Sequence, residues 1–221
     1  MPVSPLRLIA SFLILAVAGA CAAGGKTDPA LPSPSVDEPL ASAQTVEEAV
    51  IAGGCFWGVE AVFRHVKGVQ SATSGYSGGA AGSARYPLVS TGSTGHAESV
   101  KILYDSSQIT YGQILRVFFS VVHDPTELNR QGPDVGSQYR SAVFYGNAEQ
   151  KRIAEAYIAQ LAGSFSHPIV TQVVPLKAFY PAESYHQDYA ARHPNEPYIV
   201  FNDAPKIEHL RKRFPNLYRD K

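Results

Sequence analysis

Cys55 is the residue whose type and position most readily suggest chemistry. The chain contains two cysteines, Cys21 and Cys55, too few for a disulfide framework or an all-cysteine zinc site, so any reactive thiol acts nearly alone. An apolar run at 49–52 and two glycines precede Cys55, and apolar residues at helical spacing from 59 to 66 follow it. We therefore expect a strand, a turn and a helix, with the thiol at the helix N-terminus. Unpaired N–H groups and the positive end of the helix dipole favour a thiolate there, whereas an inert buried cysteine is the alternative.

Two aromatic residues, Phe56 and Trp57, directly follow this cysteine, and Trp57 is the only tryptophan. Large rings beside a nucleophile form an apolar surface for a small uncharged group, although rings near a helix start more often pack into a core. Glu98 is a candidate acid, because strand alternation places it on the same face as Val100 and Ile102. An apolar environment would raise its pKa toward neutrality, whereas a surface position at the strand end is the alternative.

The elements that must position these residues mix strands and helices along the chain. Residue patterns predict strands at 49–52, 100–104, 141–145 and 169–176, a helix between Cys55 and Gly68, and helices at 108–122 and 147–161. Asn147 and Gln150 are placed like a capping box at the start of the last helix. This order predicts an α/β fold, a two-layer sandwich with a mixed sheet and flanking helices.

Residues 1–20 have the pattern of an export signal. Arg7 precedes an uncharged, mostly apolar stretch from Leu8 to Ala20, which is too short to cross a hydrocarbon core of roughly 30 Å as a permanent helix. Cleavage after this stretch would give a plain exported protein, whereas a bacterial lipoprotein would be acylated on Cys21. We favour the lipoprotein, and expect a periplasmic or membrane-anchored location. Residues 21–45, rich in Pro, Ala and Ser, are predicted to be a tether.

The charge balance bounds the class of partner. Nineteen Lys and Arg residues oppose nineteen Asp and Glu residues, which removes the basic field that nucleic-acid binding normally needs. Residues 46–205 are predicted to form one folded domain, and we expect a monomer. The basic tail 206–221, with a net charge of +4, is predicted to be a solvated helical end with a frayed terminus.

Several motifs, in order along the chain, carry a resemblance to a known family. They are Gly54-Cys55-Phe56-Trp57-Gly58, Gly75-Tyr76-Ser77-Gly78-Gly79, Tyr86 leading to Thr94-Gly95-His96-Ala97-Glu98, His123-Asp124-Pro125, Asp134 through Gly136-Ser137-Gln138-Tyr139-Arg140-Ser141, and Tyr185-His186-Gln187. Across about residues 46–201 the chain resembles the peptide methionine sulfoxide reductases of the A type. The resemblance implies a catalytic domain at 46–205 that reduces the S epimer of methionine sulfoxide, free or in oxidised proteins, with no metal or flavin cofactor.

Four residues would carry out the oxygen transfer. Cys55 would attack the sulfoxide sulfur as a thiolate and end as a sulfenic acid. A sulfoxide oxygen is a poor leaving group until it is protonated, so the site needs an acid, and Glu98 fits this role. The resemblance implies that Tyr86 and Tyr139 donate hydroxyl hydrogen bonds to the same oxygen.

Further residues are assigned by the resemblance to the substrate and to recycling. Phe56 and Trp57 would receive the substrate methyl group. Asp134 lies in a loop with Gly and Pro, where a lone Asp is ordinarily a turn former. The resemblance implies that Asp134 also helps a reductant thiol to attack the sulfenic acid. The histidines of the motifs are interpreted as structural; they are His96, His123 and His186.

No cysteine follows Cys55, whereas many members of the family carry resolving cysteines near the C-terminus. We therefore expect an external thiol reductant, such as a thioredoxin-like protein, to recycle the enzyme. Cys21 would act as the resolving thiol only if it is not lipidated. A Cys-His acyl-transfer enzyme and a binding module that uses the aromatic residues without chemistry are the alternatives.

Overall fold

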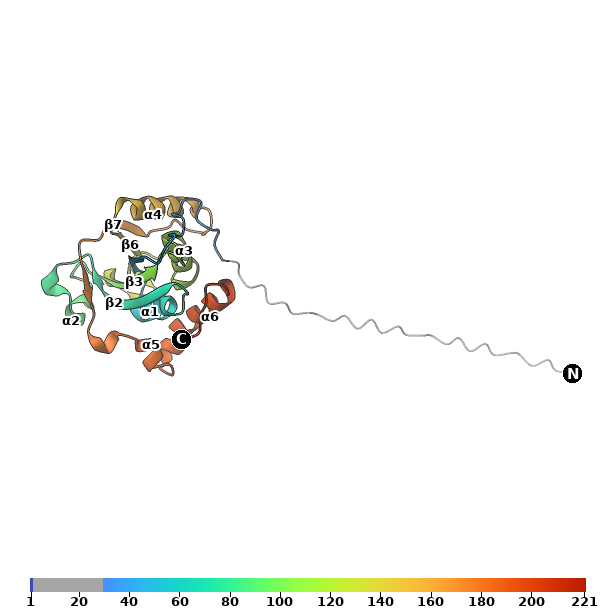
Figure 1. The fold of residues 1–221 in the computed structure, drawn as a ribbon. Helices are drawn as coiled ribbons and strands as arrows, with labels where there is room; N and C mark the ends of the chain where they lie inside the picture. Colours follow the sequence, from blue (N-terminus) through green and yellow to red (C-terminus); the bar gives the residue numbers. More distant parts are fainter. Residues whose placement is uncertain (2–29) are drawn as a thin grey trace.

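Six strands form one mixed sheet in the order β7-β6-β1-β3-β2-β8 (Figure 1). The protein is seen here in a computed structural model that describes Met1 and residues 30–221. The strands are β1 (Val46–Ala52), β2 (Val69–Ser77), β3 (Ala97–Asp105), β6 (Ala142–Tyr145), β7 (Gln172–Pro175) and β8 (Phe179–Pro181). Neighbouring strands are antiparallel except for β6 and β7, which are parallel. The predicted mixed sheet is confirmed.

Helices pack mainly against one face of this sheet. They are α1 (Phe56–Arg64), α2 (Tyr86–Val89), α3 (Tyr111–Val117), α4 (Ala148–Gln160), α5 (Tyr189–Arg192) and α6 (Ala204–Arg213). Short 3₁₀ or π turns lie at Ala81–Ser83, Phe118–Val122, Ser137–Tyr139, Ser184–His186 and Ile199–Asp203, and β4 (Arg130–Gln131) pairs with β5 (Asp134–Val135) in a small hairpin. Helix α1 contacts β2 and β3, while α4 contacts β6 and β7.

Alternation along the central strands assigns their residues to two faces. Val100 and Ile102 of β3 are fully buried in the main core, together with the apolar sides of the helices. Val50 and Ala97 face the other way, into a smaller cluster covered by the segment that contains β7 and β8. The predicted two-layer α/β sandwich is therefore confirmed.

Strands β2 and β8 lie outside the elements that the sequence pattern predicts. The predicted strands correspond to β1, β3, β6 and β7, and the predicted helices to α1, α3 and α4. Strand β2 is rich in small residues, and its buried Ser74 and Ser77 give no apolar alternation. The missing side chain of Gly75 leaves room for the Phe179 ring on β8, which a Cβ atom would overlap. The small residues of β2 are therefore explained by the close approach of β8 and not by hydrophobicity.

The predicted capping box at α4 is half formed. The Asn147 side chain accepts a hydrogen bond from the Gln150 N–H at 2.8 Å, but the Gln150 side chain accepts from the Gly146 N–H instead of from Asn147. A complete capping box is found at α3, between Thr110 and Gln113.

The tether predicted at 21–45 is wrong for its described part, residues 30–45. The Asp37 carboxylate accepts hydrogen bonds from the Gly112 N–H at 2.9 Å and the Thr110 hydroxyl at 2.5 Å, at the start of α3. A carboxylate there pairs with N–H groups that have no partner within the helix, and it interacts favourably with the helix dipole. This segment therefore binds the domain through hydrogen bonds that hydrophobic periodicity does not reveal.

More contacts hold the same segment against α3 and α4. The Tyr157 hydroxyl donates to the Pro32 carbonyl at 2.8 Å, and the Arg116 side chain donates to the Leu31 carbonyl at 2.7 Å. The export signal and Cys21 lie outside the described residues. In the part of the chain that the structure describes, no helix has the length and apolar character needed to cross a membrane.

The C-terminal tail begins as a helix, as predicted, but the prediction that it is solvated and frayed is wrong. Helix α6 runs across the predicted boundary at 205, and Leu210 and Phe214 are buried in the main core. Tyr218 continues this contact by pairing with Val66 in an isolated bridge. Apolar residues three or four positions apart form a narrow buried stripe on this helix. The charged residues between them make the overall composition polar, so composition alone does not reveal the stripe.

Removal of the Asp37 carboxylate is expected to destabilise the fold. Asp37→Ala leaves the first N–H groups of α3 without this acceptor, so we expect a loss of about 1–2 kcal/mol in unfolding free energy, and a melting temperature lower by about 2–8 °C. Glu48→Ala is the control, because this exposed side chain forms no hydrogen bond or ion pair among the described residues. Equal melting temperatures for the two variants would show that residues 30–45 do not stabilise the domain.

Candidate active site

Cys55 lies between β1 and α1, at the N-cap position of the helix. Its side chain is 8% exposed, and it is the free cysteine of the described residues. Gly54 makes the turn with a φ of +93°, and a Cβ atom there would come within 2.7 Å of the Gln131 side chain. The predicted strand, turn and helix around the cysteine are confirmed, and the glycine is required both by its backbone angle and by the close approach of Gln131.

Glu98 lies directly beside the start of α1. Its side chain is 2% exposed and accepts a hydrogen bond from the Phe56 N–H at 3.1 Å. It lies in β3, on the same face as Val100 and Ile102, as the alternation predicts. Burial is the main cause that raises the pKa of Glu98 to about 8; the hydrogen bond from the Phe56 N–H lowers this pKa, and the charge of Asp134 raises it by less. At neutral pH this group is a neutral acid that can give up a proton.

The pKa of the Cys55 thiol is raised, whereas a helix N-terminus alone would lower it. Burial raises its pKa well above the ordinary value, and the Glu98 and Asp203 carboxylates raise it further. The backbone N–H of Trp57 and the charge of Lys206 lower this pKa by less. Burial therefore opposes the thiolate that the helix end favours.

Tyr86 and Tyr139 come from two loops that are joined by hydrogen bonds. Ser137 Oγ donates to the Gly92 carbonyl at 2.5 Å, and the Glu183 carboxylate accepts from the Tyr86 N–H at 2.9 Å. Burial, followed by the charge of Glu98, raises the pKa of both tyrosines. Both hydroxyls stay protonated, and neither has a hydrogen-bond partner among the described residues, so both are available as donors.

Phe56 and Trp57 form an aromatic surface beside the thiol. Phe56 is buried, and its ring centroid lies 5.0 Å from that of His186. The half-buried Trp57 stacks on Tyr189, with ring centroids 3.8 Å apart, and its Nε1 donates to His186 Nδ1 at 3.2 Å. This fixes the orientation of the only tryptophan.

Asp134 lies in a turn and also contacts the residues around the aromatic surface. It pairs with Gln131 in the β4–β5 hairpin, as a turn residue would. Its Oδ2 also accepts a hydrogen bond from the Tyr198 hydroxyl at 2.5 Å, and Tyr198 packs edge-on against Trp57 at 5.9 Å. Asp134 thus connects this loop to the aromatic surface, and its charge acts on Glu98.

Asp203 and Lys206 are residues of this region that the sequence analysis missed. Asp203 is fully buried, and its Oδ1 lies 3.1 Å from Lys206 Nζ. The pair rests on the first turns of α1, where a Cβ atom at Gly58 would overlap with Asp203 Oδ1. Both residues act on the Cys55 pKa. Their spacing of three residues at a helix start was the available sequence signal.

The histidines of the motifs do not pair with Cys55. His123 Nε2 lies 2.7 Å from Ser141 Oγ, and burial lowers the His123 pKa to about 3. The His96 ring accepts from the Gly79 N–H at 3.2 Å. His186 is hydrogen-bonded to Trp57, so none of the three is placed as a base for the thiol, which disfavours the acyl-transfer alternative. Tyr76 is fully buried, and its hydroxyl donates to Glu183.

No group of three or more His, Cys, Asp or Glu side chains within the described residues is arranged to hold a metal ion. The fold and the site define a class of cysteine-dependent oxidoreductases, in which a buried thiol lies beside a buried neutral carboxyl group and protonated phenols. Comparison with known proteins gives the family. A model of the peptide methionine sulfoxide reductase family matches residues 47–218.

Relatives and solved structures agree with that match. A peptide methionine sulfoxide reductase from Mesorhizobium japonicum is 58% identical over 79% of this chain and 91% of its own length, and one from Thermus thermophilus is 50% identical over 78% and 98%. The structure of methionine sulfoxide reductase A from Corynebacterium diphtheriae has a TM-score of 0.61 at 33% identity, covering 76% of this chain and 86% of that one. The chain belongs to the peptide methionine sulfoxide reductase family, and it is an oxidoreductase that reduces methionine sulfoxide.

The raised pKa of Glu98 predicts a pH-dependent stability. Its pKa is 4.5 ordinarily and about 8 in the fold, so the folded state keeps a proton that the unfolded chain loses, and stability falls as pH rises through this window. Glu98→Gln removes the ionisation, and we expect it to gain about 3–5 kcal/mol relative to the parent between pH 5 and pH 9 in urea unfolding. Glu155→Gln, half-exposed on α4, is the control. A constant difference across this range would show that Glu98 titrates normally.

Proposed function

We propose that this site reduces the S epimer of methionine sulfoxide, free or in oxidised proteins, with Cys55 as the nucleophile and Glu98 as the acid. The observation that carries the proposal is the buried Glu98 carboxyl group, with a pKa of about 8, hydrogen-bonded to the Phe56 N–H beside the thiol. The preference for the S epimer rests on membership of the A type.

The proton inventory of the site fits oxygen transfer. The Cys55 sulfur attacks the sulfoxide sulfur while Glu98 donates its proton to the sulfoxide oxygen, and Glu98 then receives the proton that the thiol loses. The oxygen then moves to the Cys55 sulfur, as both the sulfur–oxygen bond of the substrate and the new bond between the two sulfur atoms break, so the products are a Cys55 sulfenic acid and methionine. The thiol is oxidised by two electrons, the substrate is reduced by two, and no proton is taken from water. A thiol with a raised pKa suits this route, because it ionises as the substrate gains a proton.

The remaining predicted residues bind the substrate. Tyr86 and Tyr139 have protonated hydroxyls without protein partners, which suits donation to a sulfoxide oxygen that gains negative charge. Phe56 and Trp57 offer the apolar surface for the methyl group. An apolar wall and polar donors in one site would orient the sulfoxide with its sulfur toward Cys55.

Recycling requires a thiol from outside the domain. The sequence has no cysteine after Cys55, and the described residues contain no other free cysteine. A thioredoxin-like protein or another thiol reductant would attack the sulfenic acid, and the family resemblance assigns Asp134 to that step. We also propose export on the signal at 1–20 and a lipid anchor at Cys21, supported by the sequence pattern alone.

Single-turnover kinetics test the roles of Cys55 and Glu98. With excess methionine sulfoxide and no reductant, the parent should form about one methionine per Cys55, and Cys55→Ser should form none. Glu98→Ala should slow this step by about 10²- to 10⁴-fold, and Glu98→Gln by less, because an amide still donates a hydrogen bond. The parent rate should fall as pH rises through about 8, where Glu98 loses its proton. Full activity of Cys55→Ser would end the proposal, and an unchanged pH profile in Glu98→Gln would remove Glu98 as the acid.

The oxidised product tests the mode of recycling. After one turnover the mature protein should carry a sulfenic acid that dimedone traps at Cys55, detected by mass spectrometry, because no second thiol lies in the described domain. A Cys21→Ser variant is the matched control and should give the same adduct. A Cys21–Cys55 disulfide as the main product of the parent would show that recycling is intramolecular.

A further inference from the structure

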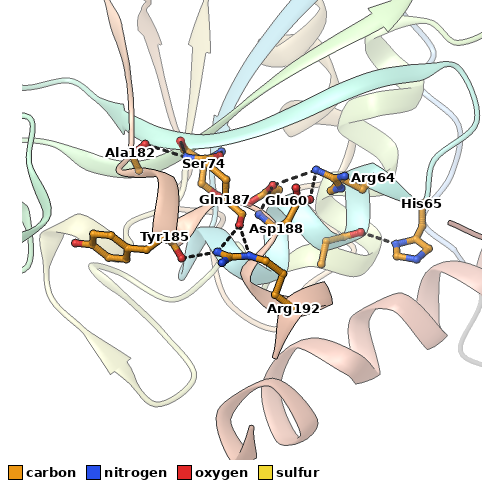
Figure 2. A network of polar contacts seen from close by, with 10 residues as sticks. Glu60, Arg64, His65, Ser74, Ala182, Tyr185, Gln187, Asp188 and Arg192 are labelled. Carbon is orange, nitrogen blue, oxygen red and sulfur yellow. Dashed lines mark hydrogen bonds and ion pairs between the residues drawn. The ribbon is translucent and has the colours of Figure 1, made fainter. Parts of the chain in front are cut away.

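We propose that Glu60 is a positioning residue for the reaction, which holds Trp57 in place by binding helix α1 to the segment 182–192. The proposal rests on the proposed function, in which Trp57 receives the substrate methyl group. It concerns a set of polar contacts behind the aromatic surface, shown in Figure 2, that the reaction itself does not use.

Glu60 is a buried carboxylate with partners on three parts of the chain. It is 2% exposed, and its Oε2 accepts a hydrogen bond from Ser74 Oγ of β2 at 2.7 Å. Its Oε1 accepts from the Asp188 N–H at 3.0 Å. Arg64, one turn further along α1, lies 3.5 Å from Glu60 and forms an ion pair with Asp188. A single side chain on α1 thus binds both the sheet and the segment 182–192 (Figure 2).

Neighbouring side chains fix the path of that segment. Gln187 accepts from the Ser74 N–H at 3.0 Å and donates to the Ser74 and Ala182 carbonyls at 2.9 and 3.0 Å, as a paired strand would. Arg192 donates to the Tyr185 and Gln187 carbonyls, both at 2.7 Å. Asp188 has a φ of +55°, a left-handed conformation that a non-glycine residue keeps only when its surroundings hold it.

The segment carries the two rings that support Trp57. His186 and Tyr189 lie on either side of Asp188, the residue that Glu60 binds. Trp57 donates to His186 at 3.2 Å and stacks on Tyr189 at 3.8 Å. Trp57 and Glu60 are three residues apart on α1, so both contacts act between the same two elements. A change at Glu60 therefore changes the support of the indole without touching it.

Packing alone does not hold the segment. A cavity of about 620 Å³ lies between α1, α5 and α6, and Tyr189, Ala190 and Ile207 are among its lining residues. Side chains beside a cavity lose contact partners, so apolar packing constrains this side of α5 less than a filled core would. The hydrogen bonds of Glu60, together with those of Gln187 and Arg192, therefore help to fix the positions of Tyr189 and His186.

Loss of the Glu60 carboxylate should appear in substrate binding and in tryptophan fluorescence. Glu60→Ala leaves the Asp188 N–H and the Ser74 hydroxyl unpaired, and the freed segment no longer fixes Trp57. We expect KM for methionine sulfoxide to rise by about 5- to 20-fold, with the saturated single-turnover rate changed by less than about threefold. Because Trp57 is the only tryptophan, its emission maximum should move to longer wavelength. Glu60→Gln keeps one acceptor oxygen and should restore part of both effects.

Tyr157→Phe is the matched control. Tyr157 lies on α4, away from this network, and the substitution removes its hydrogen bond to the Pro32 carbonyl. It should lower the melting temperature without changing KM or emission. Equal KM and emission for Glu60→Ala and Tyr157→Phe would overturn the proposal. If Glu60→Ala does not fold, Glu60→Gln and Ser74→Ala decide the matter by the same two readouts. An absence of methionine formation by the parent would overturn the proposed function, whereas the emission of the variants would still test the contact with Trp57.

Discussion

The hydrogen bond from the Phe56 N–H to the Glu98 carboxyl group joins the sheet to the helix that carries the thiol. The first N–H groups of α1 have no partners inside the helix, and a buried carboxyl oxygen needs a donor, so each satisfies the other. Strand β3 lies in the interior of the sheet, between β1 and β2, and is therefore a rigid support for Glu98. Every other contribution to the site is placed relative to this pair: Cys55 by the preceding turn, the phenols by the loops, and the aromatic surface by the first turn of α1.

Two opposing electrostatic effects meet at Cys55, and their magnitudes decide the protonation state. A helix N-terminus stabilises a charge by about 0.3–1 kcal/mol, and by up to about 2 kcal/mol where it is partly buried. Burial acts in the other direction and raises the pKa of Cys55 well above its ordinary value despite the helix end. Burial also raises the pKa of Glu98 to about 8, so Glu98 keeps its proton at neutral pH. This arrangement avoids an exposed thiolate and makes ionisation of the thiol depend on a substrate that takes up the proton.

The sequence predicted the parts of the site that depend on local patterns. The turn before Cys55 and the inward face of Glu98 follow from glycines and from alternation within short segments. The raised pKa of Cys55, by contrast, could not be predicted, because a local motif shows the helix end but not the burial around it. Glu60 was also missed, because its partners Ser74 and Asp188 are brought to it by the fold. Asp203 and Lys206 are close in sequence, but their contact with α1 is visible only in the folded chain. The segment 30–45 and helix α6 were taken as solvated because their composition is polar, yet single groups such as Asp37 and Leu210 bind them to the domain.

The buried C-terminal helix bears on how the enzyme is recycled. In a chain with a resolving cysteine near its end, that end must reach the sulfenic acid. Here Leu210 and Phe214 fix α6 in the main core, and the Asp203–Lys206 pair seats its start on α1. Even a thiol added to this region would have to leave these contacts before it could reach Cys55. The C-terminal segment is thus packed into the core, and the sequence has no cysteine after Cys55. Both features agree with recycling by a separate thiol, which must reach Cys55 where 8% of the residue is exposed.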